Sequence, residues 1–355
     1  MSASLRSFHG VPDGLVELDA RALATRLGGP SLIYVPGRRG PPLFVSVLLH
    51  GNETGGWEGV RRLLRDGGLP RRGGLPRGGT LPRRGTLPRS LLLFIGNVAA
   101  AAAGVRTLPD QQDYNRIWRG AIGTEAALAA EVMSAVAAHR PFAAVDLHNN
   151  TGRNPHYAVL TELTRENLGL ARLFDDKAVY VQEPDSVLAR AFAGRCPAVT
   201  LELGPIGDPR GDLLALDYLE RCLALDEVPT ADAATLRLYR AEARVHVAPG
   251  VAFGFAGGDE SRPLVLTGGL EAVNFHELPP GTEFAAIRRP LGAVLEVRDA
   301  LHRNVTDDYF VAVDGRVRLR RAVTPAMFTT DPAVVRQDCL CYFMAPLAQE
   351  RLRAR

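Results

Sequence analysis

Lysine is almost absent from this sequence of 355 residues, in which Lys177 is the only one. A Walker A phosphate loop needs a lysine directly after a glycine, and Lys177 follows Asp176, so this class of nucleotide-binding site is excluded. Cysteines number only four, which argues against a disulfide scaffold and is typical of a reducing cytoplasm. No apolar run approaches the roughly 18 residues of a membrane span, and the N-terminal residues lack the apolar core of a secretory signal. We therefore expect a cytoplasmic protein that does not contact membranes.

Positive charge is concentrated in one tract. The net charge is +3, yet residues 61–89 contain nine arginines and a single acidic residue, so the remaining chain is acidic. A nucleic-acid-binding domain is therefore not indicated. Residues 67–90 consist of near-copies of Gly/Thr-Leu-Pro-Arg, which predict a flexible loop. This loop is either an arginine arm for an acidic partner such as RNA or a tolerated expansion. We favour the expansion, because long loop insertions cost little free energy.

Up to about residue 235, short apolar runs alternate with helical patterns. We expect strands at Ser31–Tyr34, Leu43–Leu49, Leu91–Ile95, Ala143–Leu147, Tyr157–Leu160, Ala178–Val181 and Ala198–Leu203, and helices at Trp57–Arg65, Glu125–His139, Arg165–Phe174 and Asp212–Leu225. Unbroken runs of this kind are typical of strands covered on both faces, so residues 1–235 predict an α/β domain with a mostly parallel or mixed sheet between helices. Gly, Pro and Asp-Gly turns between short runs predict a smaller β-rich domain over residues 236–355.

Polar residues stand at or near the ends of three predicted strands. His50 and Glu53 follow the strand at Leu43–Leu49, and His148 follows the strand at Ala143–Leu147. Glu202 lies near the end of the strand at Ala198–Leu203. The carboxyl ends of strands in an open α/β sheet border one crevice, so these side chains should converge. Each alone has an ordinary explanation, such as a buried hydrogen-bonded histidine or a carboxylate beside a helix terminus. Together, two histidines and a carboxylate suit Zn²⁺ with one position left for water, and a further glutamate could serve as general base.

A fourth stretch extends this pattern to a family resemblance. It reads GNVAAAAAGVRTLPDQQDYNRIW and spans Gly96–Trp118. With HGNE, DLHNN and LELGP, in this order and at these separations, it resembles the succinylglutamate desuccinylase/aspartoacylase family of the M14 zinc carboxypeptidase superfamily. The resemblance covers roughly residues 40–210.

The resemblance implies a metal centre. His50, Glu53 and His148 match the ligands of one Zn²⁺ per chain, and Glu202 matches the base that activates the attacking water. A catalytic zinc with three protein ligands keeps its fourth position for water.

The resemblance also implies a substrate site beside the metal. Arg106 matches the arginine that steadies the carbonyl oxygen as it becomes an oxyanion, and Asn115 and Arg116 match the pair that binds the substrate carboxylate. A guanidinium suits both tasks, because it pairs with carboxylates through two hydrogen bonds and stabilises developing negative charge.

We therefore expect a zinc-dependent amidohydrolase that cleaves the acyl-amide bond of a small carboxylate-bearing substrate, such as an N-acyl amino acid. A metallocarboxypeptidase acting on peptides and a non-catalytic binding protein on the same scaffold are the alternatives, and ester cleavage and a homo-oligomer stay open.

The spacing of Cys339 and Cys341 predicts that they occupy alternate positions of one strand. We do not favour a second metal there, because a structural zinc site needs more ligands close by.

Overall fold

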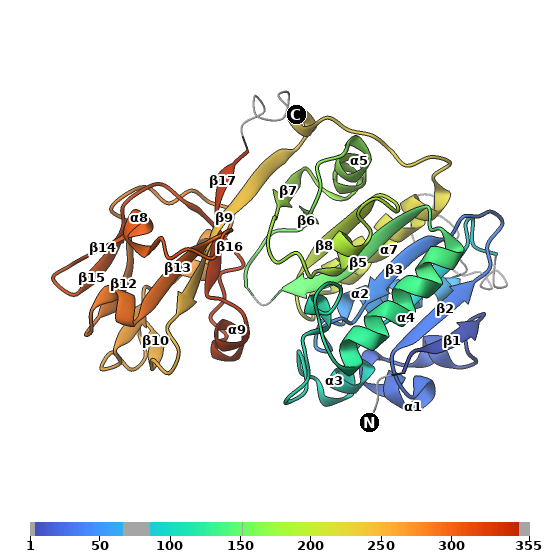
Figure 1. Ribbon diagram of the computed structural model, residues 1–355, viewed down its shortest axis with the longest axis horizontal. Helices are drawn as coiled ribbons and strands as arrows, with labels where there is room; N and C mark the ends of the chain where they lie inside the picture. The colour runs from blue at the N-terminus through green and yellow to red at the C-terminus, as the bar shows by residue number, and fades with distance from the viewer. Residues whose placement is uncertain (1–3, 67–85, 151, 348–355) are drawn as a thin grey trace, which may run out of the picture. The chain divides into compact units, whose positions relative to one another are not determined.

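The computed structural model describes residues 4–66, 86–150 and 152–347, which form two compact units (Figure 1). The first unit comprises Met1–Asn149 and His156–Arg237, and the second comprises Asn150–Pro155 and Leu238–Arg355. Most of the repeat loop predicted at 67–90 lies outside the described residues. The division into a hydrolase domain over 1–235 and a β-rich domain over 236–355 stays a prediction.

The first unit is built on a mixed sheet. In spatial order its strands are β1 (Arg6–His9), β2 (Ser31–Val35), β4 (Leu91–Ile95), β3 (Leu43–Val47), β5 (Ala143–Asn150), β8 (Ala198–Pro205), β6 (Tyr157–Leu160) and β7 (Lys177–Tyr180). The pairs β1–β2, β3–β4, β3–β5 and β6–β7 are parallel, whereas β2–β4 and β6–β8 are antiparallel. The predicted α/β architecture is confirmed, and its sheet is of the mixed kind.

Helices cover both faces of this sheet. They are α1 (Leu23–Leu27), α2 (Gly55–Asp66), α3 (Val98–Ala103), α4 (Thr124–His139), α5 (Arg165–Phe174), α6 (Leu188–Ala191) and α7 (Pro209–Ala224), with 3-10 turns η1 (Leu15–Glu17), η2 (Ala20–Ala22), η3 (Tyr114–Arg116) and η4 (Ala233–Thr235). The helix predicted at Arg165–Phe174 has these bounds in the structure, and the other three predicted helices differ by one to three residues at their ends.

The two faces of the sheet can be assigned from side-chain alternation. Phe44 of β3 and Ala144 of β5 share a hydrophobic cluster with Val132 of α4, so α4 covers the face of the even-numbered residues (Figure 1). On the other face, a Cβ at Gly56 of α2 would lie 2.8 Å from the Cβ of Leu147. Helix α2 therefore covers the odd-numbered face, where it packs against α7.

The second unit is rich in β-structure, as predicted. Strand β9 (Arg237–Val247) pairs with β13 (Leu295–Asp299) and β17 (Cys341–Pro346), and β17 pairs with β16 (Thr324–Ala326). A second sheet has the order β10 (Phe253–Phe255), β11 (Leu264–Leu266), β12 (Glu283–Ile287), β15 (Arg316–Leu319) and β14 (Phe310–Val313). The remaining elements are α8 (Thr306–Tyr309), α9 (Pro332–Gln337), η5 (Leu270–Val273) and η6 (Leu291–Ala293).

The core of the second unit is aromatic. The Phe284 ring is fully buried, and its centroid lies 4.8 Å from that of Phe310 and 5.8 Å from that of Phe343.

The prediction that Cys339 and Cys341 occupy alternate positions of one strand is wrong, because β17 begins at Cys341 and Cys339 precedes it. None of the described helices combines the length and the apolar character that crossing a membrane requires.

Candidate metal centre and active site

The centre of the site is a tight turn between β3 and α2. The backbone N–H of Glu53 donates to the carbonyl of His50 (3.1 Å), which closes a four-residue turn and brings both side chains to the same side. The Nδ1 of His50 then lies 2.7 Å from Oε1 of Glu53. Gly51 occupies a position without room for a side chain, since a Cβ there would lie 2.2 Å from the backbone nitrogen of Ala101.

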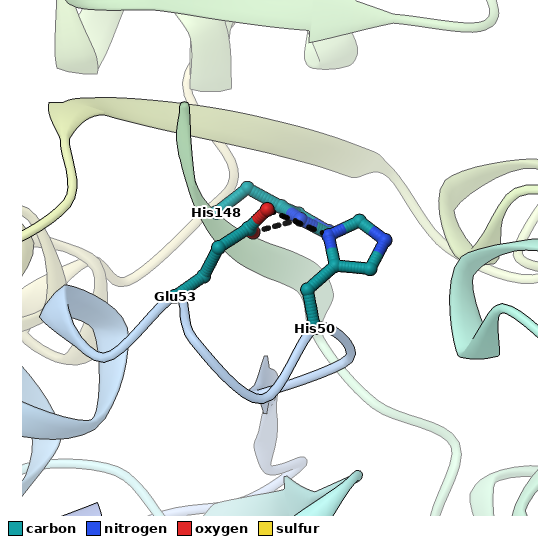
Figure 2. Close-up of side chains that lie close together, drawn as sticks. All are labelled: His50, Glu53 and His148. Atoms are coloured by element: carbon teal, nitrogen blue, oxygen red, sulfur yellow. Dashed lines mark hydrogen bonds and ion pairs between the residues drawn. The ribbon is translucent and has the colours of Figure 1, made fainter. Parts of the chain in front are cut away.

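His148 completes a three-residue cluster from the neighbouring strand (Figure 2). Its Nδ1 lies 2.8 Å from Oε2 of Glu53, so the two Glu53 oxygens face the two histidines. All three side chains are buried, and one ligand atom from each lies within 4.8 Å of the others. The sequence predicts that His148 follows the strand. In the structure His148 lies inside β5, because the strand continues to Asn150.

Each histidine is held on its far side by an aspartate. The Nε2 of His50 lies 3.0 Å from Oδ1 of Asp113, and the Nε2 of His148 lies 2.9 Å from Oδ2 of Asp146. An ionised aspartate only accepts hydrogen bonds, so each Nε2 carries the proton and each Nδ1 of a neutral ring presents a lone pair to Glu53. Lone pairs facing a carboxylate at this distance require a cation or a proton between them.

The charges in the cluster agree with this arrangement. Burial favours the neutral form of Glu53, but the two histidines outweigh it and hold the pKa of Glu53 well below its usual range. Burial likewise favours the neutral ring of His148, yet Asp146 and Glu53 raise the pKa of His148 well above its usual value. The carboxylates thus favour positive charge at this position. Two imidazole nitrogens and one carboxylate, each imidazole backed by a second carboxylate, fit a divalent metal ion at the same place.

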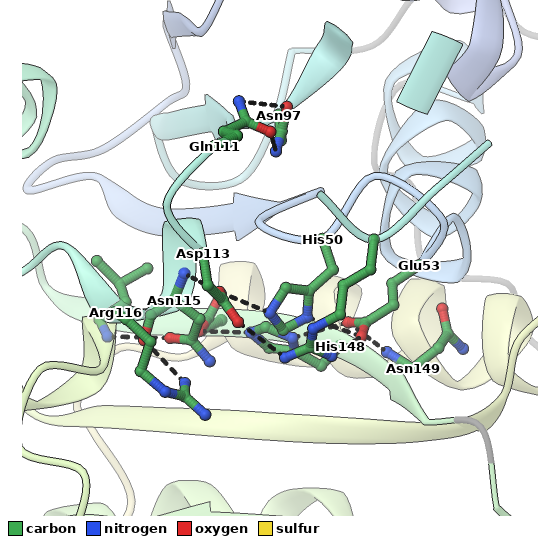
Figure 3. A network of polar contacts seen from close by, with 12 residues as sticks. His50, Glu53, Asn97, Gln111, Asp113, Asn115, Arg116, His148 and Asn149 are labelled. Atoms are coloured by element: carbon green, nitrogen blue, oxygen red, sulfur yellow. Dashed lines mark hydrogen bonds and ion pairs between the residues drawn. The ribbon is translucent and has the colours of Figure 1, made fainter. Parts of the chain in front are cut away.

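A second group of charged residues adjoins the cluster (Figure 3). The guanidinium of Arg106 lies 3.5 Å from Oε1 of Glu53 and donates to Oδ2 of Asp113 (3.0 Å). Asp113 also accepts from the backbone N–H of Asn115 (2.7 Å), so it caps the η3 turn. Burial works against ionisation of Asp113, but His50, Arg106 and Arg116 hold its pKa well below the usual range.

The η3 turn carries Asn115 and Arg116 and is fixed on two sides. Tyr114 inside it is buried in the cluster beneath α4, and Asn115 Oδ1 accepts from the backbone N–H of Leu188 at the start of α6 (3.3 Å). The Nη1 of Arg116 donates to the carbonyl of Asn115 (3.0 Å). The buried Tyr114 thus holds the η3 turn beside Asp113. The turn carries one positive charge, on the half-buried Arg116.

The loop that carries Arg106 is held by an amide pair. The side chains of Asn97 and Gln111 hydrogen-bond reciprocally, at 2.8 and 3.2 Å (Figure 3). Asn97 Oδ1 also accepts from the backbone N–H of Ala100, which caps α3, and Gln111 Oε1 accepts from that of Leu108. These bonds close the segment between α3 and the η3 turn and so fix the backbone on both sides of Arg106.

Glu202 lies in β8, the strand next to β5. Its side chain is buried, with 6% exposed, and it stands opposite Tyr157 in the β6–β8 pairing. Asn149 ties this strand to the cluster, because its Nδ2 donates to the carbonyl of Gly204 (3.1 Å) and its Oδ1 accepts from the N–H of Gly55 (2.9 Å).

Comparison with known proteins relates this arrangement to a family. A sequence model of the succinylglutamate desuccinylase/aspartoacylase catalytic domain matches residues 39–217, half of the chain, including the turn, the η3 segment and both strands of the site. The chain belongs to this family. It is accordingly a hydrolase, and the resemblance predicted from the four motifs is confirmed. No curated protein sequence matches the chain.

Solved structures show the same fold at low sequence identity. Murine aminoacylase 3 is 17% identical, with a TM-score of 0.56 over 87% of this chain and 97% of that chain. Succinylglutamate desuccinylase from Vibrio parahaemolyticus is 16% identical, with a TM-score of 0.53 over 83% and 86%. The succinylglutamate desuccinylase/aspartoacylase from Rhodobacter sphaeroides is 15% identical, with a TM-score of 0.52 over 89% of both chains.

Within this family member, the structure brings together His50, Glu53 and His148, and it places Arg106 against Glu53. Asp113, Asp146 and Asn149 have no role predicted from the sequence, although each stands inside one of the four motifs. Asp146 had a readable signal, because residues two apart on a strand share a face. The contacts of Asp113 and Asn149 depend on residues far along the chain and had no such signal.

The other possible metal and nucleic-acid sites gain no support. Among the described residues, the only group of three or more histidine, cysteine or acidic side chains close enough to hold a metal is the cluster above. In the arginine tract, Arg61 pairs with Glu58 and Arg62 with Asp212. Arg89 donates to the carbonyl of Pro41 and lies 3.8 Å from the centre of the Phe142 ring. These three arginines form contacts within the first unit, and residues 67–85 of the tract lie outside the described part of the chain.

Proposed function

We propose that the protein is a zinc-dependent amidohydrolase that cleaves the acyl-amide bond of a small substrate with a free carboxylate, such as an N-acyl amino acid. The observation that carries the proposal is the convergence of His50, Glu53 and His148, with a second carboxylate behind each histidine. Such carboxylate–histidine pairs fix the ring orientation and raise the basicity of the ligating nitrogen.

The choice of Zn²⁺ follows from the donor set. Two imidazole nitrogens and one carboxylate are borderline-soft ligands, whereas Mg²⁺ and Ca²⁺ prefer oxygen alone. Three protein ligands leave the fourth tetrahedral position for water or substrate. Bound there, zinc would polarise a carbonyl group and lower the pKa of water to near neutrality.

The residues around the metal have separate tasks in this proposal. Asn115 and Arg116 bind the substrate carboxylate and so direct the scissile carbonyl toward the cluster. Arg106, fixed between Glu53 and Asp113, stabilises negative charge on the carbonyl oxygen. Glu202 accepts a proton from the attacking water and returns it to the leaving amine, as one carboxylate can serve as base and then as acid.

Substitution of the base tests the proposal most simply. Glu202→Gln keeps the side-chain shape and removes the proton acceptor, so we expect kcat to fall roughly 10²–10⁴-fold. Zinc content should stay at the wild-type level, since Glu202 is not among the ligands. Hydrolysis is followed with a panel of N-acyl amino acids and short peptides, after loading with zinc. Glu58→Gln in α2, whose carboxylate pairs with Arg61, is the matched control and should retain the wild-type rate.

Three outcomes would contradict the proposal. Wild-type rates in Glu202→Gln would refute the role of the base. Turnover of tripeptides without turnover of N-acyl amino acids would favour the metallocarboxypeptidase, and no turnover of either would favour the non-catalytic binding protein.

The location that we propose is the cytoplasm. All four cysteines are free thiols, three of them buried, which agrees with a reducing compartment. The partner that we propose is a small-molecule substrate.

A further inference from the structure

Two buried polar atoms next to the metal cluster lack hydrogen-bond partners among the described residues. They are the hydroxyl oxygen of Ser46 and Oδ1 of Asp146. Ser46 is completely buried and Asp146 is 3% exposed, so bulk water does not solvate either group. A buried polar atom without a partner costs roughly 1–3 kcal/mol, and more when the group is charged.

These two residues are direct neighbours in the sheet. Ser46 of β3 and Asp146 of β5 are register partners in a parallel pair, where adjacent strands lie about 4.8 Å apart. Register partners point to the same face, which here is the face of Phe44 and Ala144 beneath α4. One torsion angle, about the Cα–Cβ bond, sets the direction of the serine hydroxyl.

Asp146 is also the residue behind His148. Its other oxygen, Oδ2, accepts from Nε2 of His148 at 2.9 Å, and the Nδ1 of that ring faces Glu53. The orientation of the Asp146 carboxylate therefore determines the orientation of the imidazole. A hydroxyl that donates to Oδ1 would hold the carboxylate plane from its far side.

We propose that Ser46 is a positioning residue of the metal centre, donating a hydrogen bond to Oδ1 of Asp146 and so fixing His148. The chain Ser46–Asp146–His148 runs from β3 into β5 and ends at the metal ligand. This inference rests on the proposed function, in which His148 binds zinc. It makes the buried serine part of the determinants of metal affinity, although it is not itself a ligand.

Zinc affinity of purified protein tests the proposal without recourse to activity. It is measured by competition with a chromophoric chelator, for wild type and for four variants. Asp146→Asn provides the reference for loss of the outer carboxylate, which costs about 10–100-fold in metal affinity. Ser46→Ala should weaken zinc binding by about tenfold, the lower end of that range, because it acts one bond further out. Ser46→Thr retains the hydroxyl and should restore affinity to within about twofold of wild type.

Ser31→Ala is the matched control. Ser31 is another completely buried serine on a strand of the same sheet, but its hydroxyl bonds the carbonyl of Gly29 (2.9 Å). Its loss should leave zinc affinity unchanged, even if the unfolding midpoint of the metal-free protein falls as it does in Ser46→Ala. Wild-type zinc affinity in Ser46→Ala would overturn the inference, as would an equal loss in Ser31→Ala or in Ser46→Thr. Failure of the wild type itself to take up zinc would refute the proposed function instead.

Discussion

At the scale of single residues, Asp113 links the parts of the site. One of its oxygens bonds Nε2 of His50 and the N–H of Asn115, and the other bonds Arg106. The proposed metal ligand His50, the proposed oxyanion partner Arg106 and the turn proposed to bind the substrate carboxylate thus share one half-buried carboxylate. The position of each of these groups depends on the others, so the site should act as a unit in mutational experiments.

Arg116 offers a prediction on substrate binding alone. It lies on the turn beside Asp113 but forms no part of the three-residue cluster. Arg116→Ala should raise KM by roughly 10–100-fold, the loss of one charged hydrogen bond worth about 1.5–3 kcal/mol. We expect kcat to change less than KM, because the substrate carboxylate is bound equally in the ground and transition states. Steady-state kinetics on the best N-acyl amino acid gives both constants.

The control for this experiment lies three residues along the chain. Arg119 is largely exposed and pairs with Asp185 (3.6 Å), so Arg119→Ala should keep the wild-type KM. A loss of kcat at unchanged KM in Arg116→Ala would contradict the role of carboxylate anchor.

At the scale of elements, the turn between β3 and α2 brings His50 and Glu53 together, two of the three proposed ligands. Its shape depends on close backbone contact, since the N–H of Gly51 donates to the carbonyl of Arg106 (3.0 Å) and the glycine lies against α3. The turn thereby ties the His50–Glu53 pair to the segment that carries Arg106. A side chain at Gly51 would separate these two elements.

Substitution of this glycine should therefore destabilise the protein. A Cβ at Gly51 would lie 2.2 Å from the backbone of Ala101, so Gly51→Ala forces one element to move. We expect a loss of roughly 1–3 kcal/mol in the free energy of unfolding, as found for overpacked sites. Gly29→Ala is the control, because the nearest atom to its Cβ would be 3.8 Å away. Urea denaturation of both variants measures the effect, and equal midpoints for the two would contradict this account of the turn.

At the scale of the whole molecule, the sequence predicts more of the buried structure than of its edges. Apolar runs marked the central strands, but β1 (Arg6–His9) was missed because it is short, polar and mostly exposed. Helix α3 was also missed, although the capping residue Asn97 and the terminal Gly104 were readable signals. The prediction left the sheet as mostly parallel or mixed, since strands buried on both faces look alike in either direction.

The site divides in the same way. The HGNE turn and the histidine of β5 were predictable, because each stands at the end of an apolar run. The strand itself was predicted to end at Leu147, yet it continues through Asn149 and Asn150, polar residues that bond within the folded protein. The Asn149 bond joins segments 55 residues apart in the sequence, and local pattern does not contain it.

The zinc content of the intact protein tests the central claim most directly. We expect about one equivalent of zinc per chain in wild-type protein purified without chelator, measured by elemental analysis. His50→Ala and His148→Ala should lose this zinc, whereas His9→Ala, at an exposed histidine of the same unit, should retain it. Zinc retained in both cluster variants, or absent from wild-type protein even after loading, would contradict the account.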